Sequence, residues 1–331
     1  MLKPQLMNEP NSAHFHYKER FFIHISHFRK KIFTFSVFLF LIACVTPLGT
    51  NSAKLQVVAT TNLVGDAVRI VGGEHIELTV LVPLGSDPHA YEPAPRDAAL
   101  VSGADLLFVN GLGLESFLQS LLENVSNETK IGSVSDGIQA VEGEHEQEND
   151  EEQGEEILDP HVWQDPTNMM VWVENIAAAL VQTDPSNAQE YDANAEAYIS
   201  ELKDLDLWIM DEVDALPQQR RVMVTDHEAF DYFARRYGFE IVGVVIPSVS
   251  TLASPSARSM VDLQQAIATY QVPAIFISTT TNPDVVSQLA QDLGVGIVPI
   301  FGESLSSADG PAPTYLAMMR YNVNAIVTAL K

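Results

Sequence analysis

Cysteine and positive charge are both scarce in this 331-residue sequence. The one cysteine, Cys44, excludes a disulfide framework and any metal cluster built on several thiolates. Lysine and arginine total 18 against 44 aspartates and glutamates, which gives a formal net charge of −26. Binding to nucleic acid needs a basic surface, so the charge balance argues against a nucleic-acid partner.

A membrane-spanning hydrophobic run is also missing. The apolar segment 32–44 carries no charge, but it is shorter than the ~20 residues that a membrane helix needs. It follows the basic residues 29–31, an arrangement typical of a secretory leader. We therefore predict a leader over 1–44 and an extracytoplasmic protein, in the periplasm or on the outer face of the cytoplasmic membrane.

The leader ends in the residues LIAC, which resemble a lipoprotein processing site. This predicts lipidation of Cys44, which would be the chain's only attachment to a membrane. An ordinary cleaved signal peptide is the alternative.

After the leader, short apolar runs alternate with amphipathic helical patterns, which predicts an α/β fold with parallel sheets. Two such regions, 54–166 and 218–331, are predicted lobes, and helices over 167–217 join them. A helical pattern over 185–216 predicts one long, rigid connecting helix. Because ligands bind beyond the carboxyl ends of parallel strands, we expect the binding site in the cleft between the lobes.

Residues 142–156 interrupt this pattern. Nine of these fifteen residues are acidic, and the segment contains one histidine, His145. It shows no hydrophobic periodicity, so we interpret it as an acidic loop within the N-terminal lobe.

Four residues that follow predicted strands or lie at the expected cleft are candidate metal ligands: His89, His161, His227 and Glu303. The tripeptide Asp-Pro-His occurs twice and ends at His89 and at His161. Proline stiffens the backbone before each imidazole, which suits a ligand that must meet a metal at ~2.0–2.1 Å. Asp87, Glu92 and Asp159 are candidate hydrogen-bond partners of these histidines.

Three imidazoles and one carboxylate, without a thiolate, suit Zn²⁺ and are acceptable to Mn²⁺ or Fe²⁺. Each residue alone also has an ordinary interpretation. A loop histidine is commonly just exposed, His227 could begin a helix, and Glu303 could be a surface glutamate.

Several strings, in this order, resemble the metal-specific solute-binding proteins of zinc and manganese ABC transporters: VVATTNLVGDAVRIVGG, GSDPHAYEP, ADLLFVNGLGLESF, DPHVWQDPTN, TDHEAFDYFARRYGF, PAIF and AMMRYN. The resemblance covers nearly the whole mature chain. It implies two lobes around a rigid helix, with one divalent metal bound between them. The family's ligand positions fall on His89, His161, His227 and Glu303. Where many members end a strand in an acidic residue, this chain has Ser278.

The resemblance further implies delivery of the metal to a membrane permease powered by a cytoplasmic ATPase. We expect capture without catalysis, by a monomer, with Zn²⁺ as the transported ligand and Mn²⁺ or Fe²⁺ as alternatives. A surface adhesin is a further alternative. A zinc hydrolase is less favoured, because the sequence from His227 has Asp231 where the helix pattern H-E-x-x-H requires its second histidine.

Overall fold

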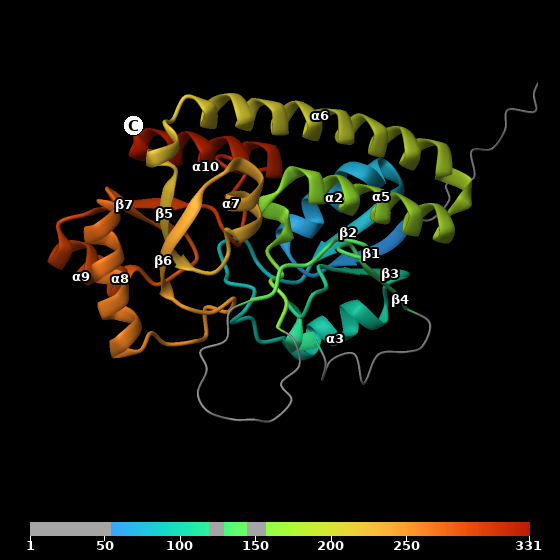
Figure 1. Ribbon diagram of the computed structural model, residues 1–331. Coiled ribbons are helices and arrows are strands. Elements are labelled where there is room, and N and C mark those ends of the chain that lie inside the picture. Colours follow the sequence, from blue (N-terminus) through green and yellow to red (C-terminus); the bar gives the residue numbers. More distant parts are fainter. Residues whose placement is uncertain (1–53, 119–128, 144–156) are drawn as a thin grey trace, which may run out of the picture. The chain divides into compact units, whose positions relative to one another are not determined.

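Two four-stranded parallel sheets organise the part of the chain that the structure describes (Figure 1). The computed structural model describes residues 54–118, 129–143 and 157–331. The first sheet, in the order β2-β1-β3-β4, contains β1 (Leu55–Ala59), β2 (Ile76–Val80), β3 (Leu106–Val109) and β4 (Lys130–Ser133). The second sheet, in the order β6-β5-β7-β8, contains β5 (Val222–His227), β6 (Glu240–Ile246), β7 (Ala274–Ser278) and β8 (Gly296–Ile300). The predicted α/β class is confirmed.

Helices connect and cover these strands, as parallel pairing requires. The described α-helices are α2 (Asn62–Gly72), α3 (Pro95–Ser102), α5 (Pro166–Thr183), α6 (Ala188–Asp214), α7 (Asp231–Tyr237), α8 (Ala257–Tyr270), α9 (Pro283–Leu293) and α10 (Tyr315–Leu330). Polar caps fix several starts: the Asp165 side chain accepts a hydrogen bond from Thr167 N at the start of α5, and Thr314 caps α10 in the same way.

The alternation of side chains along each strand divides the apolar residues between two faces of a sheet. In the first sheet, Val57 and Ala59 of β1 face a large core, whereas Val58 faces a small cluster together with Leu107. The second sheet follows the same rule. Its residue Met223 faces the large core, and Val224 faces a separate cluster.

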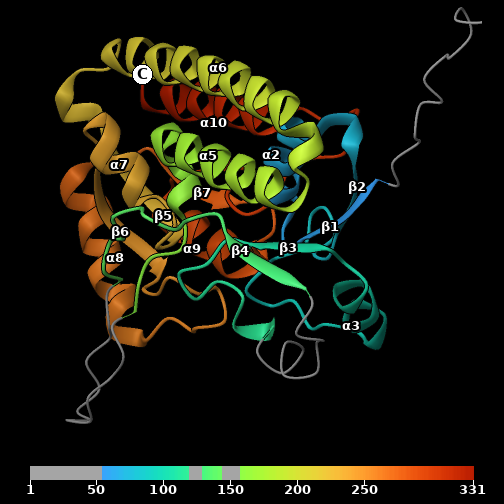
Figure 2. The same ribbon diagram turned by 90° about the vertical axis from the view of Figure 1, so that its right-hand side faces the viewer.

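One hydrophobic core therefore includes a face of each sheet. The long helix α6 lies over this core beside α5 and α10 (Figure 2) and also packs against α2. Its 27 residues correspond to about 40 Å of helix. A 3₁₀ turn, Pro185–Asn187, precedes α6, so the α-helix itself is shorter than the predicted pattern.

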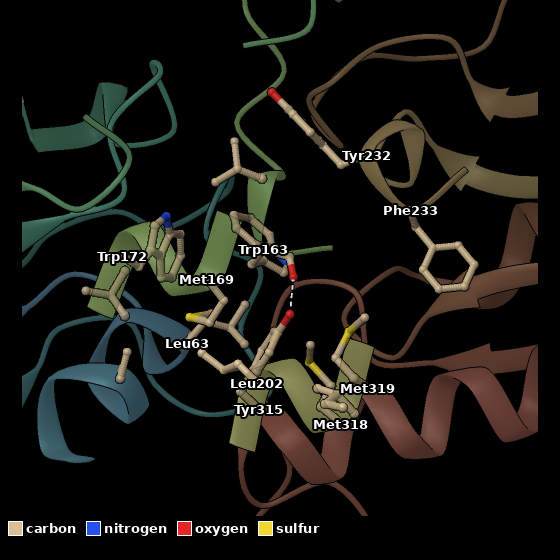
Figure 3. Packing of buried hydrophobic residues seen from close by; sticks show 14 of the residues in the cluster. Leu63, Trp163, Met169, Trp172, Leu202, Tyr232, Phe233, Tyr315, Met318 and Met319 are labelled. Carbon is tan, nitrogen blue, oxygen red and sulfur yellow. Dashed lines mark hydrogen bonds between the residues drawn. The ribbon is translucent and has the colours of Figure 1, made fainter. Parts of the chain in front are cut away.

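Close-packed aromatic and sulfur-containing side chains fill the centre of this core (Figure 3). The Tyr315 hydroxyl of α10 donates a hydrogen bond of 2.7 Å to the carbonyl oxygen of Trp163, and both side chains are buried. The N-terminal end of α10 is thereby attached to the segment that precedes α5.

Residues 54–331 form one compact unit, and the division into lobes at 166 and 218 stays a prediction. The predicted leader with Cys44 and most of the predicted acidic loop, 144–156, lie outside the described residues. The ends of that loop are joined by an antiparallel bridge between Glu142 and Leu158. Among the described helices, none combines the length and the hydropathy that crossing a membrane requires.

Candidate metal centre

The four side chains that the sequence singled out meet at one buried point. The structure brings ligand atoms of His89, His161, His227 and Glu303 within 4.8 Å of one another. The Nε2 atoms of His89 and His161 are 3.1 Å apart. Glu303 Oε1 lies 3.3 Å from Nε2 of His161 and also 3.3 Å from Nε2 of His227. Glu303 Oε2 lies 3.8 Å from Nε2 of His89.

Each of these residues lies at the end of a strand or within a connecting segment. His227 is the last residue of β5, where its backbone pairs with Ile246 of β6. Glu303 lies in the connection between β8 and α10. His89 follows β2, and His161 directly precedes the 3₁₀ turn Val162–Gln164. The site therefore forms where the carboxyl ends of the two parallel sheets face each other, as expected for open α/β sheets.

The position of His227 argues against the zinc-hydrolase alternative. The metalloprotease pattern needs its two metal-binding residues on one helix. Here His227 belongs to a strand, whereas Asp231 begins α7. The two residues therefore do not share one turn of helix.

Aspartates orient two of the imidazoles. Asp159 Oδ1 accepts hydrogen bonds from His161 N at 2.9 Å and from His161 Nδ1 at 2.7 Å. Asp226 Oδ1 lies 3.1 Å from His227 N and 3.2 Å from His227 Nδ1. A carboxylate at Nδ1 selects the tautomer that leaves the Nε2 lone pair free for a metal.

The other two predicted partners behave differently. Asp87 Oδ1 accepts a hydrogen bond from the backbone N of His89 at 2.8 Å, and its second oxygen accepts one from the Thr251 hydroxyl. Asp87 thus holds the loop, while the imidazole of His89 has no carboxylate at Nδ1 among the described residues. Glu92 is exposed, and the described residues include no hydrogen bond between it and His89.

Sequence reasoning missed Asp226. Its second oxygen, Oδ2, accepts hydrogen bonds from Ser278 N at 3.0 Å and from the Thr281 hydroxyl. Asp226 therefore supplies a carboxylate beside Ser278, the position at which the sequence lacks one. The available signal was an acidic residue directly before a candidate histidine.

Burial makes the electrostatics of this cluster strong. The His161, His227 and Glu303 side chains are 0% exposed, and the His89 side chain is 7% exposed. Burial opposes charge on Glu303, but the imidazoles of His161 and His227 hold the pKa of its carboxyl well below the ordinary value. Burial lowers the pKa of His89 to about 3.

The other two histidines shift the opposite way. Burial disfavours the charged imidazole of His161, but Glu303 and Asp159 outweigh it and raise the pKa to about 9. Asp226 and Glu303 likewise outweigh burial at His227 and raise its pKa well above the ordinary value.

Nε2 of His227 and both carboxylate oxygens of Glu303 are buried without hydrogen-bond geometry to any described partner. Such unsatisfied atoms are costly, and a cation among them would satisfy all three.

The arrangement offers three imidazole nitrogens and a carboxylate without a thiolate, a donor set that fits Zn²⁺ and accepts Mn²⁺ or Fe²⁺. His89 lines a surface pocket together with Leu112, Ile157, Val249 and Leu252. Two parallel sheets around a buried histidine–carboxylate cluster define a two-lobed metal-binding protein.

Comparison with known proteins identifies the family. The sequence model described as "ZnuA: Zinc-uptake complex component A periplasmic" matches residues 57–329. The chain belongs to this family of substrate-binding proteins of metal ABC transporters, which confirms the resemblance and shows that it is not an enzyme.

Curated relatives carry different metals in their names. The manganese-binding lipoprotein MntA of Halalkalibacterium halodurans is 37% identical over 287 residues, 86% of this chain and 91% of the relative. The iron ABC transporter substrate-binding lipoprotein MtsA of Streptococcus pyogenes is 32% identical over 306 residues, 89% of this chain and 95% of the relative.

Solved structures agree in fold. The periplasmic zinc binding protein TroA of Treponema pallidum superposes with a TM-score of 0.75 at 31% identity, covering 84% of this chain and 99% of that one. A Mn-bound periplasmic metal binding protein from Candidatus Liberibacter asiaticus gives a TM-score of 0.74 at 30% identity, covering 84% of this chain and 100% of that one.

Proposed function

We propose that this protein captures one divalent metal ion, Zn²⁺ in the first place, through His89, His161, His227 and Glu303. The observation that carries the proposal is the convergence of four ligand atoms within 4.8 Å, contributed by segments more than two hundred positions apart. Three nitrogens and one oxygen make a four-ligand set, the number that tetrahedral Zn²⁺ takes. A closed set leaves no position for an activated water, which suits capture without catalysis.

Mn²⁺ is the second candidate. The name of the relative at 37% identity supports it, and Glu303 supplies the oxygen ligand that Mn²⁺ prefers. Fe²⁺ follows on the same grounds, from the name of the iron-transporter relative. Nitrogen-rich coordination favours Zn²⁺ over both, since Mn²⁺ is better served by carboxylates and water.

The binding step needs a neutral lone pair on each imidazole and a charged carboxylate. Asp159 and Asp226 hold the Nδ1 protons of their histidines and leave Nε2 directed at Glu303. The metal displaces the protons that the site holds in its absence. Because one core serves both sheets, release on docking to the permease proceeds through the loops around the site rather than through a wide swing of the lobes.

We further infer that the protein works as an extracytoplasmic monomer, held at the membrane through a lipid on Cys44. It passes the ion to a membrane permease driven by a cytoplasmic ATPase. The relatives' names, which call them lipoproteins, and the sequence of the leader support this location.

Competition titration tests the choice of metal. The protein, purified without added metal, is analysed for its metal content and then titrated with Zn²⁺ and Mn²⁺ in competition. Stronger retention of Zn²⁺ at one ion per chain is the expected result. Preference for Mn²⁺ would transfer the assignment to the second candidate, and binding of neither ion would refute the proposal. The double variant His89→Ala, His161→Ala is the control, and it also separates metal capture from adhesion, which would survive it.

A further inference from the structure

Glu303 is the one carboxylate of the cluster, and it lies on a segment without helix or strand. The connection between β8 and α10 runs from residue 301 to 314. An irregular backbone does not by itself fix a side chain to the precision that a metal ligand needs. The position of Glu303 must therefore come from contacts made by the rest of the fold.

Those contacts come largely from the other half of the molecule. On one side of Glu303, the carbonyl oxygen of Gly302 accepts hydrogen bonds from Trp163 Nε1 at 2.9 Å and from Gln164 Nε2 at 3.2 Å. On the other side, the hydroxyl oxygen of Ser304 accepts a hydrogen bond of 2.8 Å from the backbone N of Gly85. Gly85 belongs to the loop that leads to His89, so Ser304 joins the loops of two proposed ligands.

Asn62, the first residue of α2, makes the double contact in this arrangement. Its Nδ2 donates to Ser304 Oγ at 3.0 Å, and its Oδ1 accepts from Leu305 N at 2.7 Å. The side chain is buried, and its partners lie more than 240 positions away. A carboxamide carries both a donor and an acceptor, so one side chain forms hydrogen bonds with the two consecutive residues directly after Glu303.

A second residue of α2 also contacts the end of this connection. Asp66 lies four residues after Asn62, on the same face of the helix. Its Oδ2 accepts a hydrogen bond of 2.8 Å from the backbone N of Tyr315, the first residue of α10. The helix thus holds the connection at both its early and its late end.

We propose that Asn62 is a positioning residue for the metal site. It holds the carboxylate of Glu303 in position next to the three imidazoles, and so it sets the affinity for the metal. The inference rests on the proposed metal-binding function. It assigns a role to the string TTNLVGD near the start of the mature chain, to which the ligand set assigns none.

The test compares Asn62→Leu, which keeps the approximate size but removes both hydrogen bonds, with the unaltered protein. The dissociation constant for Zn²⁺ is measured by competition with a chelator. We expect binding about 10- to 100-fold weaker, the range found when partners that orient a metal ligand are removed. Asn175→Leu is the matched control, because Asn175 of α5 also ties a helix to a loop. Its Nδ2 donates to the carbonyl oxygens of Val134 and Asp136, at 2.8 and 2.9 Å.

A double-mutant cycle separates positioning from a general structural effect. If Asn62 acts through Glu303, Asn62→Leu changes the affinity by no more than about twofold in a Glu303→Ala background. The inference is overturned if Asn62→Leu weakens binding in the Glu303→Ala background as much as it does in the unaltered protein. It is also overturned if a folded Asn62→Leu protein binds Zn²⁺ with unchanged affinity. Should Asn62→Leu fail to fold by circular dichroism, Asn62→Ala, which also removes both hydrogen bonds, replaces it in the same cycle with the same expectation. Failure of the unaltered protein to bind metal refutes the proposed function itself, a result distinct from either outcome of the cycle.

Discussion

One carboxylate oxygen of Asp159 accepts two hydrogen bonds from His161, at 2.9 Å from its backbone N and at 2.7 Å from its ring Nδ1. Both residues are fully buried, so this contact fixes the imidazole and its tautomer together. The same device recurs between the adjacent residues Asp226 and His227. These contacts direct two Nε2 atoms at Glu303.

Replacing Asp159 therefore tests the orientation of His161. We expect Asp159→Ala to weaken Zn²⁺ binding about 10- to 100-fold, because the imidazole loses both its direction and its tautomer. Asp159→Asn keeps an acceptor oxygen and should lose less. Chelator competition measures both variants, and equal losses for the two would contradict the account.

The four ligands should not contribute equally. His161 and His227 are fully buried, and each has an aspartate at Nδ1. His89 is 7% exposed, and Asp87 contacts its backbone N, while no carboxylate of the described residues lies at its Nδ1. We expect His161→Ala and His227→Ala to weaken binding by more than about 100-fold, beyond the loss of an orienting partner. The loss for His89→Ala should be the smallest of the three. Isothermal titration of the three variants gives the order, and a larger loss at His89 would be inconsistent with the geometry.

The Thr251 hydroxyl donates a hydrogen bond to Asp87 beside the pocket that His89 lines. Asp87 holds the backbone of His89, and the neighbours of Thr251, Ser250 and Leu252, line the pocket that His89 faces. We expect Thr251→Val to speed metal release about tenfold, the effect of losing roughly one hydrogen bond to a charged group. Thr251→Ser keeps the hydroxyl and should release metal at the original rate. Stopped-flow mixing with a chelator measures both release rates. Identical rates for Thr251→Val and Thr251→Ser would show that the Thr251 hydroxyl does not slow metal release.

Protons should compete with the metal. The pKa of His161 is raised to about 9 and that of His227 well above its ordinary value, so at pH 7 the metal-free site holds protons that a metal must displace. Affinity should therefore rise with pH up to about 9, by about tenfold per pH unit for each displaced proton. Calorimetry at pH 7 in buffers of different ionisation enthalpy measures the protons released. Binding without proton release would contradict the raised pKa values of His161 and His227.

The shared core predicts cooperative unfolding. Leu202 of α6 is fully buried in the cluster that includes faces of both sheets. We expect one thermal transition for residues 54–331, and we expect Leu202→Ala to lower stability by about 2–5 kcal/mol. Differential scanning calorimetry checks both statements. Two separate transitions would mean that the sheets unfold independently.

The convergence of the four proposed ligand residues could be predicted from sequence because their signals are local. The repeated Asp-Pro-His string marks His89 and His161, and both remaining ligands follow a recognisable apolar run. The end of β5 was harder to predict. Pairing with Ile246 extends this strand to His227, so α7 begins at Asp231 instead of at the histidine.

Features that depend on distant contacts could not be predicted in this way. The hydrogen bond between Asn62 and Ser304 joins residues 242 positions apart, and no sequence pattern near either residue indicates this contact. Strand β4, Lys130–Ser133, has no recognisable signal, because its short, half-exposed sequence KIGS lacks an apolar run. One core that includes both sheets was also not evident, since each predicted lobe has apolar residues of its own.

Metal stoichiometry in the double variant His161→Ala, His227→Ala tests the central claim most directly. Elemental analysis after equilibrium dialysis against Zn²⁺ should give one tightly held ion per chain in the unaltered protein and none in the variant. A variant that stays folded and still retains one ion with unchanged affinity would show that the metal binds elsewhere.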